Sequence, residues 1–132
     1  MALIRVALDT NAYTDLGRDN TALRQYLEQA DNIFLPFVVV AELRAGFSLG
    51  QRGQHNEARL RRFLAKDGVR ILFADTNTTS TYASLYRQLR LQGTPVPTND
   101  LWIAALAEQH ALTLVSRDAH FNKLAQLRRG FW

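Results

Sequence analysis

The sequence predicts an α/β protein in which a parallel sheet is covered by helices on both faces. Short apolar segments of strand length alternate along the chain with longer segments in which apolar residues recur every three or four positions. This alternation is typical of parallel sheets, because helices that connect parallel strands cover both faces of the sheet. The chain has 132 residues with no internal repeat and no linker-like stretch, so we expect one domain over residues 1–132.

Four segments are predicted to be strands. In the first, apolar side chains alternate from Ile4 to Leu8, and the run stops at an acid, Asp9. The other three are short and largely apolar, as expected of strands buried inside a sheet. The predicted strands are residues 4–8, 32–35, 69–73 and 112–115.

Helical periodicity predicts the intervening elements. Asp19 or Asn20 is the expected cap of the first periodic helix, and Thr98-Asn99 caps a later one that is apolar on nearly every face. Pro36 fits the first turn of a helix that ends at Gly50, although the three valines at its start leave a strand interpretation open. The predicted helices cover residues 23–30, 37–49, 60–64, 82–89 and 101–107, with a short helix after Asp118.

Composition restricts the classes of function. The chain has no cysteine, which excludes disulfides, thiolate metal sites and a cysteine nucleophile, and which suits a reducing cytoplasm. Its start is too short and too polar for a signal peptide, and its longest apolar run, residues 33–41, is far below a membrane span. The net charge is +4, with arginine far more frequent than lysine, which permits a nucleic-acid partner without requiring one.

Two acids fall where strands end. Asp9 follows the first predicted strand directly, and Asp118 follows the fourth after two intervening residues. Ligands of open α/β sheets bind beyond the carboxyl ends of the strands, so these two carboxylates are expected near one another. Each could instead cap the helix that follows, although Thr10 or Asn11 could take that role in place of Asp9.

Two further acids interrupt apolar helix faces. The helical neighbours of Glu42 at three and four positions are all apolar or small, and Asp100 opens a helix whose next turns are apolar on the same face. A buried carboxylate needs a cation, either a metal ion or an arginine, while an acid in a first helical turn is also favoured by the helix dipole. Together the four acids predict a self-repelling cluster, and oxygen ligands without cysteine or histidine indicate Mg²⁺ or Mn²⁺.

These residues resemble the PIN-domain family, and in length and order the VapC-type toxins. The residues that carry the resemblance are Asp9-Thr10-Asn11, Glu42, Asp100 with Ile103-Ala104-Ala105, and Ser116-Arg117-Asp118 with Phe121. The resemblance implies a three-layer sandwich with a parallel sheet of about five strands between helices. It implies Mg²⁺ or Mn²⁺ held by Asp9, Glu42, Asp100 and Asp118, with Thr10, Asn11 and Ser116 as supporting polar residues.

The resemblance also implies a function. It implies an endoribonuclease that hydrolyses RNA such as tRNA or rRNA, forms a homodimer or a higher toxin–antitoxin assembly, and is inhibited by a small cognate antitoxin. The chain departs from the family in two places: Ser116 stands where threonine is frequent, and His120 where a second acid is frequent, which puts the role of Asp118 in question. Substrate contacts are expected among Arg44, Arg87, Arg90, Arg117, Arg128, Arg129 and His120.

Several alternatives remain open from sequence. The basic, aromatic tail Arg128-Arg129-Gly130-Phe131-Trp132 suits RNA stacking, or packing against the body or an antitoxin. A catalytically inactive module that binds RNA or a partner would use the acids structurally. An aspartyl-phosphate phosphotransfer domain is disfavoured by Asn11 and by the position of Lys123, and a histidine-based ribonuclease by the contexts of the three histidines.

Overall fold

A computed structural model describes residues 2–132 and contains a single five-stranded sheet in the order β3-β2-β1-β4-β5. All neighbouring strands are parallel, which confirms the predicted fold class and the expected number of strands. The fifth strand was not predicted, and the other four agree with the predicted segments within two residues. The strands are β1 Arg5–Leu8, β2 Asn32–Pro36, β3 Val69–Leu72, β4 Thr113–Val115 and β5 Arg129–Gly130.

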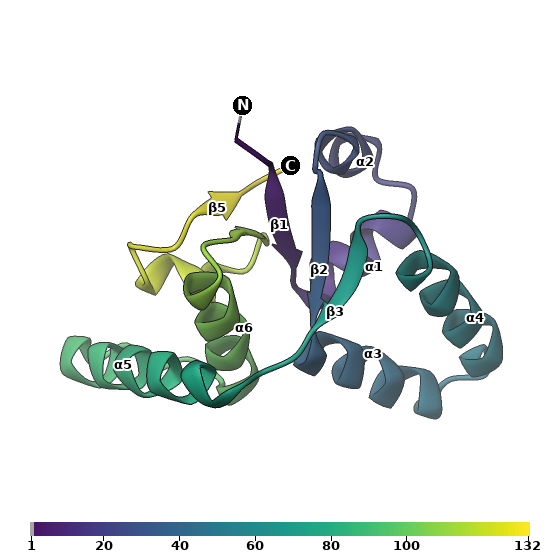
Figure 1. Ribbon diagram of the computed structural model, residues 1–132. Coiled ribbons are helices and arrows are strands. Elements are labelled where there is room, and N and C mark those ends of the chain that lie inside the picture. Colours follow the sequence, from purple (N-terminus) through teal and green to yellow (C-terminus); the bar gives the residue numbers. More distant parts are fainter. Residues whose placement is uncertain (1) are drawn as a thin grey trace.

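Helices cover the sheet on both sides. Figure 1 shows α5 and α6 packed together on one side of the strands, and α1, α2 and α4 on the other. No helix within residues 2–132 is both long enough and apolar enough to cross a membrane. The helices are α1 Thr10–Gly17, α2 Thr21–Glu28, α3 Phe37–Leu49, α4 Gly53–Leu64, α5 Thr76–Gln92, α6 Thr98–Gln109 and the 3₁₀ helix η1 Ala119–Lys123.

The strand order reverses at β1. The chain moves outward from β1 to β2 and β3, then returns to the opposite side of β1 with β4. Leu8 lies level with Val115, so β1 and β4 end together and Asp9 and Ser116 follow at the same edge. Crevices at such reversals of strand order are the usual ligand sites of open α/β sheets.

Helix α6 is the most buried helix, as its apolar composition predicted. Six of its residues are buried, and five of them, Leu101, Ile103, Ala104, Ala105 and Ala107, belong to the core that also contains the central strands. Its first turn carries Asp100, which the burial of the following turns fixes in place, whereas its other acid, Glu108, is exposed in the last turn. The helix therefore acts as a rigid mount for that carboxylate.

The structure decides between the alternatives at two predicted helix starts and corrects a third. Asn20 caps α2 by accepting a hydrogen bond from the Leu23 N–H, whereas Asp19 adopts a left-handed conformation with a φ of 58°. Pro36 ends β2 and precedes α3, which is a helix and not the alternative strand. Thr98-Asn99 lies inside α6, whose start at Pro97 has no side-chain cap, because the proline side chain has no oxygen that could accept a hydrogen bond.

The C-terminal tail is part of the sheet. Residues Arg129–Gly130 pair with Leu114 and Val115 of β4. A Cβ on Gly130 would collide with the phenol of Tyr26, so only glycine allows the strand this close to α2. Trp132 is partly buried against the core, while Phe131 stays 60% exposed.

Candidate active site

Asp9 and Ser116 form the buried floor of the site. Asp9 is only 4% exposed and its Oδ1 accepts a hydrogen bond of 2.8 Å from the Ala12 N–H, so it caps α1 in preference to Thr10 or Asn11. Its other oxygen accepts a short hydrogen bond from the Ser116 hydroxyl, which in turn accepts one of 3.0 Å from the Asp118 N–H. One serine thus connects the acid after β1 to the acid after β4.

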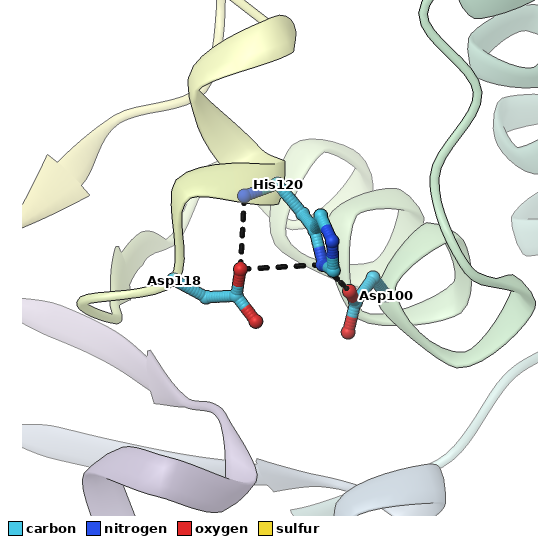
Figure 2. A group of neighbouring side chains, drawn as sticks. All are labelled: Asp100, Asp118 and His120. Carbon is cyan, nitrogen blue, oxygen red and sulfur yellow. Dashed lines mark hydrogen bonds and ion pairs between the residues drawn. The ribbon is translucent and has the colours of Figure 1, made fainter.

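Asp100 and Asp118 both lie against the same nitrogen of the His120 ring. The Nδ1 of His120 lies 2.7 Å from Asp100 Oδ2 and 3.2 Å from Asp118 Oδ1. The His120 N–H also donates to Asp118 Oδ1, at 2.9 Å, so Asp118 caps η1 as well as facing the site. Figure 2 shows the second oxygen of each carboxylate pointing the same way, away from the ring.

Glu42 approaches the cluster from α3. It is half-buried, less than the helix neighbours suggested, because Ala45 and Gly46 are exposed. Its Oε1 accepts a hydrogen bond of 2.8 Å from the Thr10 hydroxyl. Within residues 2–132 no arginine pairs with Glu42, so the ion-pair alternative is not what the structure shows.

The acids act on one another electrostatically. Burial raises the pKa of Asp9, and the charges of Asp118 and Asp100 raise it further, against the lowering by the Ser116 and Ala12 hydrogen bonds. Burial also raises the pKa of Asp100, as do the charges of Asp118 and Glu42, while His120 lowers it. All four predicted acids are therefore coupled in one cluster, which is the situation that a cation relieves.

The residues present fit a divalent cation. Asp100, Asp118 and His120 each offer a ligand atom, and these atoms lie within 4.8 Å of one another. Asp9 and Glu42 adjoin this group through Ser116 and through their charges. Carboxylate oxygens are the ligands that Mg²⁺ and Mn²⁺ prefer.

The predicted supporting residues and substrate contacts are confirmed only in part by their positions. Thr10 and Ser116 support acids as expected, whereas Asn11 is exposed. Arg117 is exposed beside the site and pairs with Asp15 at 2.8 Å. Arg44 pairs through two nitrogens with Glu57 of α4, whose pKa this pair and Arg61 lower to about 2. The remaining predicted side chains are exposed: Arg87 and Arg90 on α5, and Arg128.

Arg129 has a role that sequence reasoning missed. Its guanidinium donates to the carbonyls of Ser116 and Asp118, at 2.9 and 3.3 Å, and lies over the rings of Phe121 and Phe131. Burial lowers its pKa, while the charges of Asp9 and Asp118 oppose that shift. The tail residue therefore braces the loop that carries two site residues, a contact that no local sequence signal indicates.

The fold and the cluster together define an α/β protein whose site is suited to bind a cation at the switch point of a parallel sheet. A family model for the PIN domain matches residues 6–127, and the chain belongs to that family. The resemblance identified from the acids is thereby confirmed.

Individual relatives and structures agree with this assignment. Plasmid stability protein StbB of Pseudomonas syringae pv. tomato is 34% identical over 122 residues, which cover 86% of this chain and 87% of that protein. Ribonuclease VapC5 of Mycobacterium tuberculosis is 30% identical over 122 residues, 89% and 85% of the two chains. The toxin–antitoxin structure of VapBC2 from Rickettsia felis, bound to a promoter DNA fragment, has a TM-score of 0.86 at 26% identity and covers 96% of this chain and 98% of that one.

Proposed function

We propose that this chain is a VapC-type toxin of a toxin–antitoxin pair, a metal-dependent endoribonuclease that hydrolyses phosphodiester bonds in RNA. Relatives that carry the name of ribonuclease match it over most of both chains. The observation that carries the proposal is the convergence of Asp9, Glu42, Asp100 and Asp118 from four separate elements on one edge of the sheet. A cluster of like charges is costly to assemble unless it binds a cation.

The cation in this proposal is Mg²⁺ or Mn²⁺, held by those four carboxylates. A divalent ion, when bound, lowers the pKa of water and neutralises charge that develops on the phosphodiester. The chain's own residues orient the ligands: Ser116 holds Asp9 and the backbone of Asp118, and Thr10 holds Glu42. Ser116 and Asp9 are buried, so their geometry is set before any substrate arrives.

Substrate contacts follow from the charge around the site. Arg117 is the best placed of the predicted phosphate contacts, because it is exposed and its charge interacts with Asp9 and Asp118. Its pairing with Asp15 keeps the guanidinium at the rim and away from the carboxylates. Arg87, Arg90, Arg44 and His120 remain proposed contacts with RNA, Arg44 being the least available because of its pairing with Glu57.

The partners in this proposal are RNA, such as tRNA or rRNA, and a small cognate antitoxin in the cytoplasm. The solved structures that share the fold include VapBC-5 of Mycobacterium tuberculosis, a member of the VapBC family of toxin–antitoxin systems. We propose that this chain forms a homodimer that assembles further with its antitoxin. A gene for a short DNA-binding protein beside the gene for this chain would support that role.

RNA cleavage with added metal tests the proposal. We expect cleavage of RNA in Mn²⁺ or Mg²⁺, none in excess EDTA, and loss of activity in Asp9→Asn and in Asp100→Asn while the fold survives. Asp67→Asn changes an exposed acid in the loop before β3 and is the matched control. Wild-type turnover by either folded site variant would contradict the assignment. Tight RNA retention without cleavage would instead identify a binding module.

A further inference from the structure

The ring of His120 contacts two of the four carboxylates, those of Asp100 and Asp118. Its Nδ1, and not its exposed ring edge, is the atom that faces Asp100 and Asp118. The side chain is 43% exposed, so the ring borders both the cluster and the solvent. The nitrogen that faces the two acids is therefore the atom that would meet a cation bound between them.

We propose that His120 is a nitrogen ligand of the divalent-cation site and gives this site a preference for Mn²⁺ over Mg²⁺. The inference rests on the proposed function, since it concerns the ion of that same site.

The geometry places the nitrogen among the ligand oxygens. The candidate ligand atoms of Asp100, Asp118 and His120 lie within 4.8 Å of one another, a separation that one ion can span. In the neutral imidazole the proton resides on one nitrogen only, so a proton on Nε2 leaves the Nδ1 lone pair directed at the cluster. A cation shared by the two carboxylates would therefore lie beside an available nitrogen.

The backbone holds the ring in this position. The His120 N–H donates to the Asp118 carboxylate at 2.9 Å, within the first turn of η1. The next residue, Phe121, is 1% exposed and anchors that turn in the core. The backbone of His120 is consequently held in place beside the site, so the side chain loses little conformational entropy when it binds an ion.

Ligand chemistry gives the expected preference. Mg²⁺ is bound almost entirely by oxygen and keeps several waters. Mn²⁺ also prefers oxygen ligands, but as a first-row transition-metal ion it accepts an imidazole nitrogen beside carboxylate oxygen more readily than Mg²⁺ does. A site with carboxylates alone would discriminate little between the two ions. Adding an imidazole stabilises Mn²⁺ and leaves Mg²⁺ nearly unaffected.

A purely positioning role is the competing explanation. The same hydrogen bonds could hold Asp100 and Asp118 apart without any contact between the ring and the ion. In that case loss of His120 would weaken Mg²⁺ and Mn²⁺ by the same factor, because both ions use the two carboxylates. The ratio of the two affinities separates the explanations.

Direct binding and spectroscopy test the proposal without any activity assay. We would titrate the metal-free chain with Mn²⁺ alone and with Mg²⁺ alone by calorimetry, and record pulsed EPR spectra of the Mn²⁺ complex for nitrogen coupling. The variants are His120→Asn, which removes the imidazole, and His120→Asp, which restores an oxygen ligand. His55→Asn changes an exposed histidine on α4 and is the matched control.

We expect ¹⁴N coupling in the wild type and in His55→Asn, and its loss in both His120 variants. We expect His120→Asn to weaken Mn²⁺ by roughly tenfold or more and Mg²⁺ by less than about threefold, and His120→Asp to reduce the Mn²⁺ preference. A wild-type Mn²⁺ complex without nitrogen coupling would overturn the proposal, and this measurement needs no variant to fold. If the wild type bound Mn²⁺ no more tightly than Asp9→Asn, the metal site of the proposed function would itself be contradicted.

Discussion

Ser116 links acids from opposite ends of the chain. It is fully buried, donates to Asp9 and accepts from the Asp118 N–H, so neither group has to be desolvated without a partner. The hydroxyl also lowers the pKa of Asp9 against the effect of burial. A threonine, which the family often has at this position, would keep both hydrogen bonds.

Ser116→Ala is expected to destabilise the metal-free protein by about 1–3 kcal/mol, because it leaves buried polar groups of Asp9 and Asp118 without a partner. RNA cleavage should fall strongly as well, since both ligands lose their common support. Urea unfolding and cleavage rates measure the two effects. Ser116→Thr should retain most of the activity, and an equally inactive folded threonine variant would contradict the role of the hydroxyl.

The raised pKa of Asp9 makes stability depend on pH in a defined direction. Because the folded state holds this proton more tightly than the unfolded chain, with its value near 3.8, stability is lost as pH rises from 3.8 through the folded pKa. In EDTA at pH 7, Asp9→Asn should therefore melt above the wild type, by about 2–4 °C for roughly 1 kcal/mol.

That advantage should shrink as the pH is lowered towards 4, because the wild-type carboxyl then takes up its proton. Thermal melts of both proteins at several pH values measure the difference. The wild type and Asp9→Asn must be compared at each pH, because Glu57 and Asp75 have lowered pKa values. Both proteins therefore lose the stability that these two carboxylates give in acid. A difference in melting temperature that grows on acidification would contradict the assignment.

At the scale of single residues, the sequence predicted the four acids of the site but not the residues that contact them. Asp9 and Asp118 follow strands, and Glu42 and Asp100 interrupt apolar faces, so position within a local element was enough to select them. The burial of Glu42 was overestimated, since the exposure of Ala45 depends on which neighbours pack against α3. The contacts of His120 and Arg129 arise only when distant elements come together.

At the scale of the elements, the two-residue strand β5 positions a side chain that supports the site. It brings Arg129 under the loop between β4 and η1, where the guanidinium donates to the Ser116 and Asp118 carbonyls and stacks on Phe121 and Phe131. Lysine would keep the charge but offers no planar fork to donate in several fixed directions.

Arg129→Lys is accordingly expected to cost roughly 1–3 kcal/mol of stability and to weaken Mn²⁺ binding, because the loop that holds Asp118 loses its brace. Urea unfolding and calorimetric titration measure these effects. Arg128→Lys, at the exposed neighbouring residue, is the matched control. Equal behaviour of the two variants would show that the contacts with the loop contribute nothing.

The elements were predictable where periodicity extends over several residues. Strands β1 to β4 and helices α2, α3 and α6 satisfy that condition. Helices α4 and α5 were predicted only in part, over 60–64 and 82–89, because their first turns are polar and show no apolar period, and α1 was not predicted. The strand interpretation of 37–49 failed because thirteen residues exceed an ordinary buried strand. Strand β5 has two residues, too few for alternation to be visible. The caps of α2 and α6 depended on backbone conformations that several neighbouring polar residues could have adopted.

At the scale of the whole molecule, the strand order brings the four acids together into one cluster. Asp9 and Asp118, which precede α1 and η1, and Glu42 and Asp100, which lie in α3 and α6, reach one edge only because β1 is central and β4 lies beside it. Burial of apolar side chains from α6 and the central strands therefore has to offset the repulsion among the four carboxylates. A bound cation should act on the stability of the entire domain, because the acids are dispersed when the chain unfolds.

Metal addition is thus expected to raise the melting temperature of the wild type progressively. A ligand that binds only the folded state stabilises it by about 2.7 kcal/mol at a hundred times its Kd, and the shift continues to grow with concentration. Differential scanning calorimetry in EDTA and in increasing Mn²⁺ measures this, with Asp67→Asn as a control that should follow the wild type. Asp100→Asn should show a much smaller shift, since a ligand is lost. A melting temperature that is the same in EDTA and in millimolar Mn²⁺ would show that the four acids form no cation site at all.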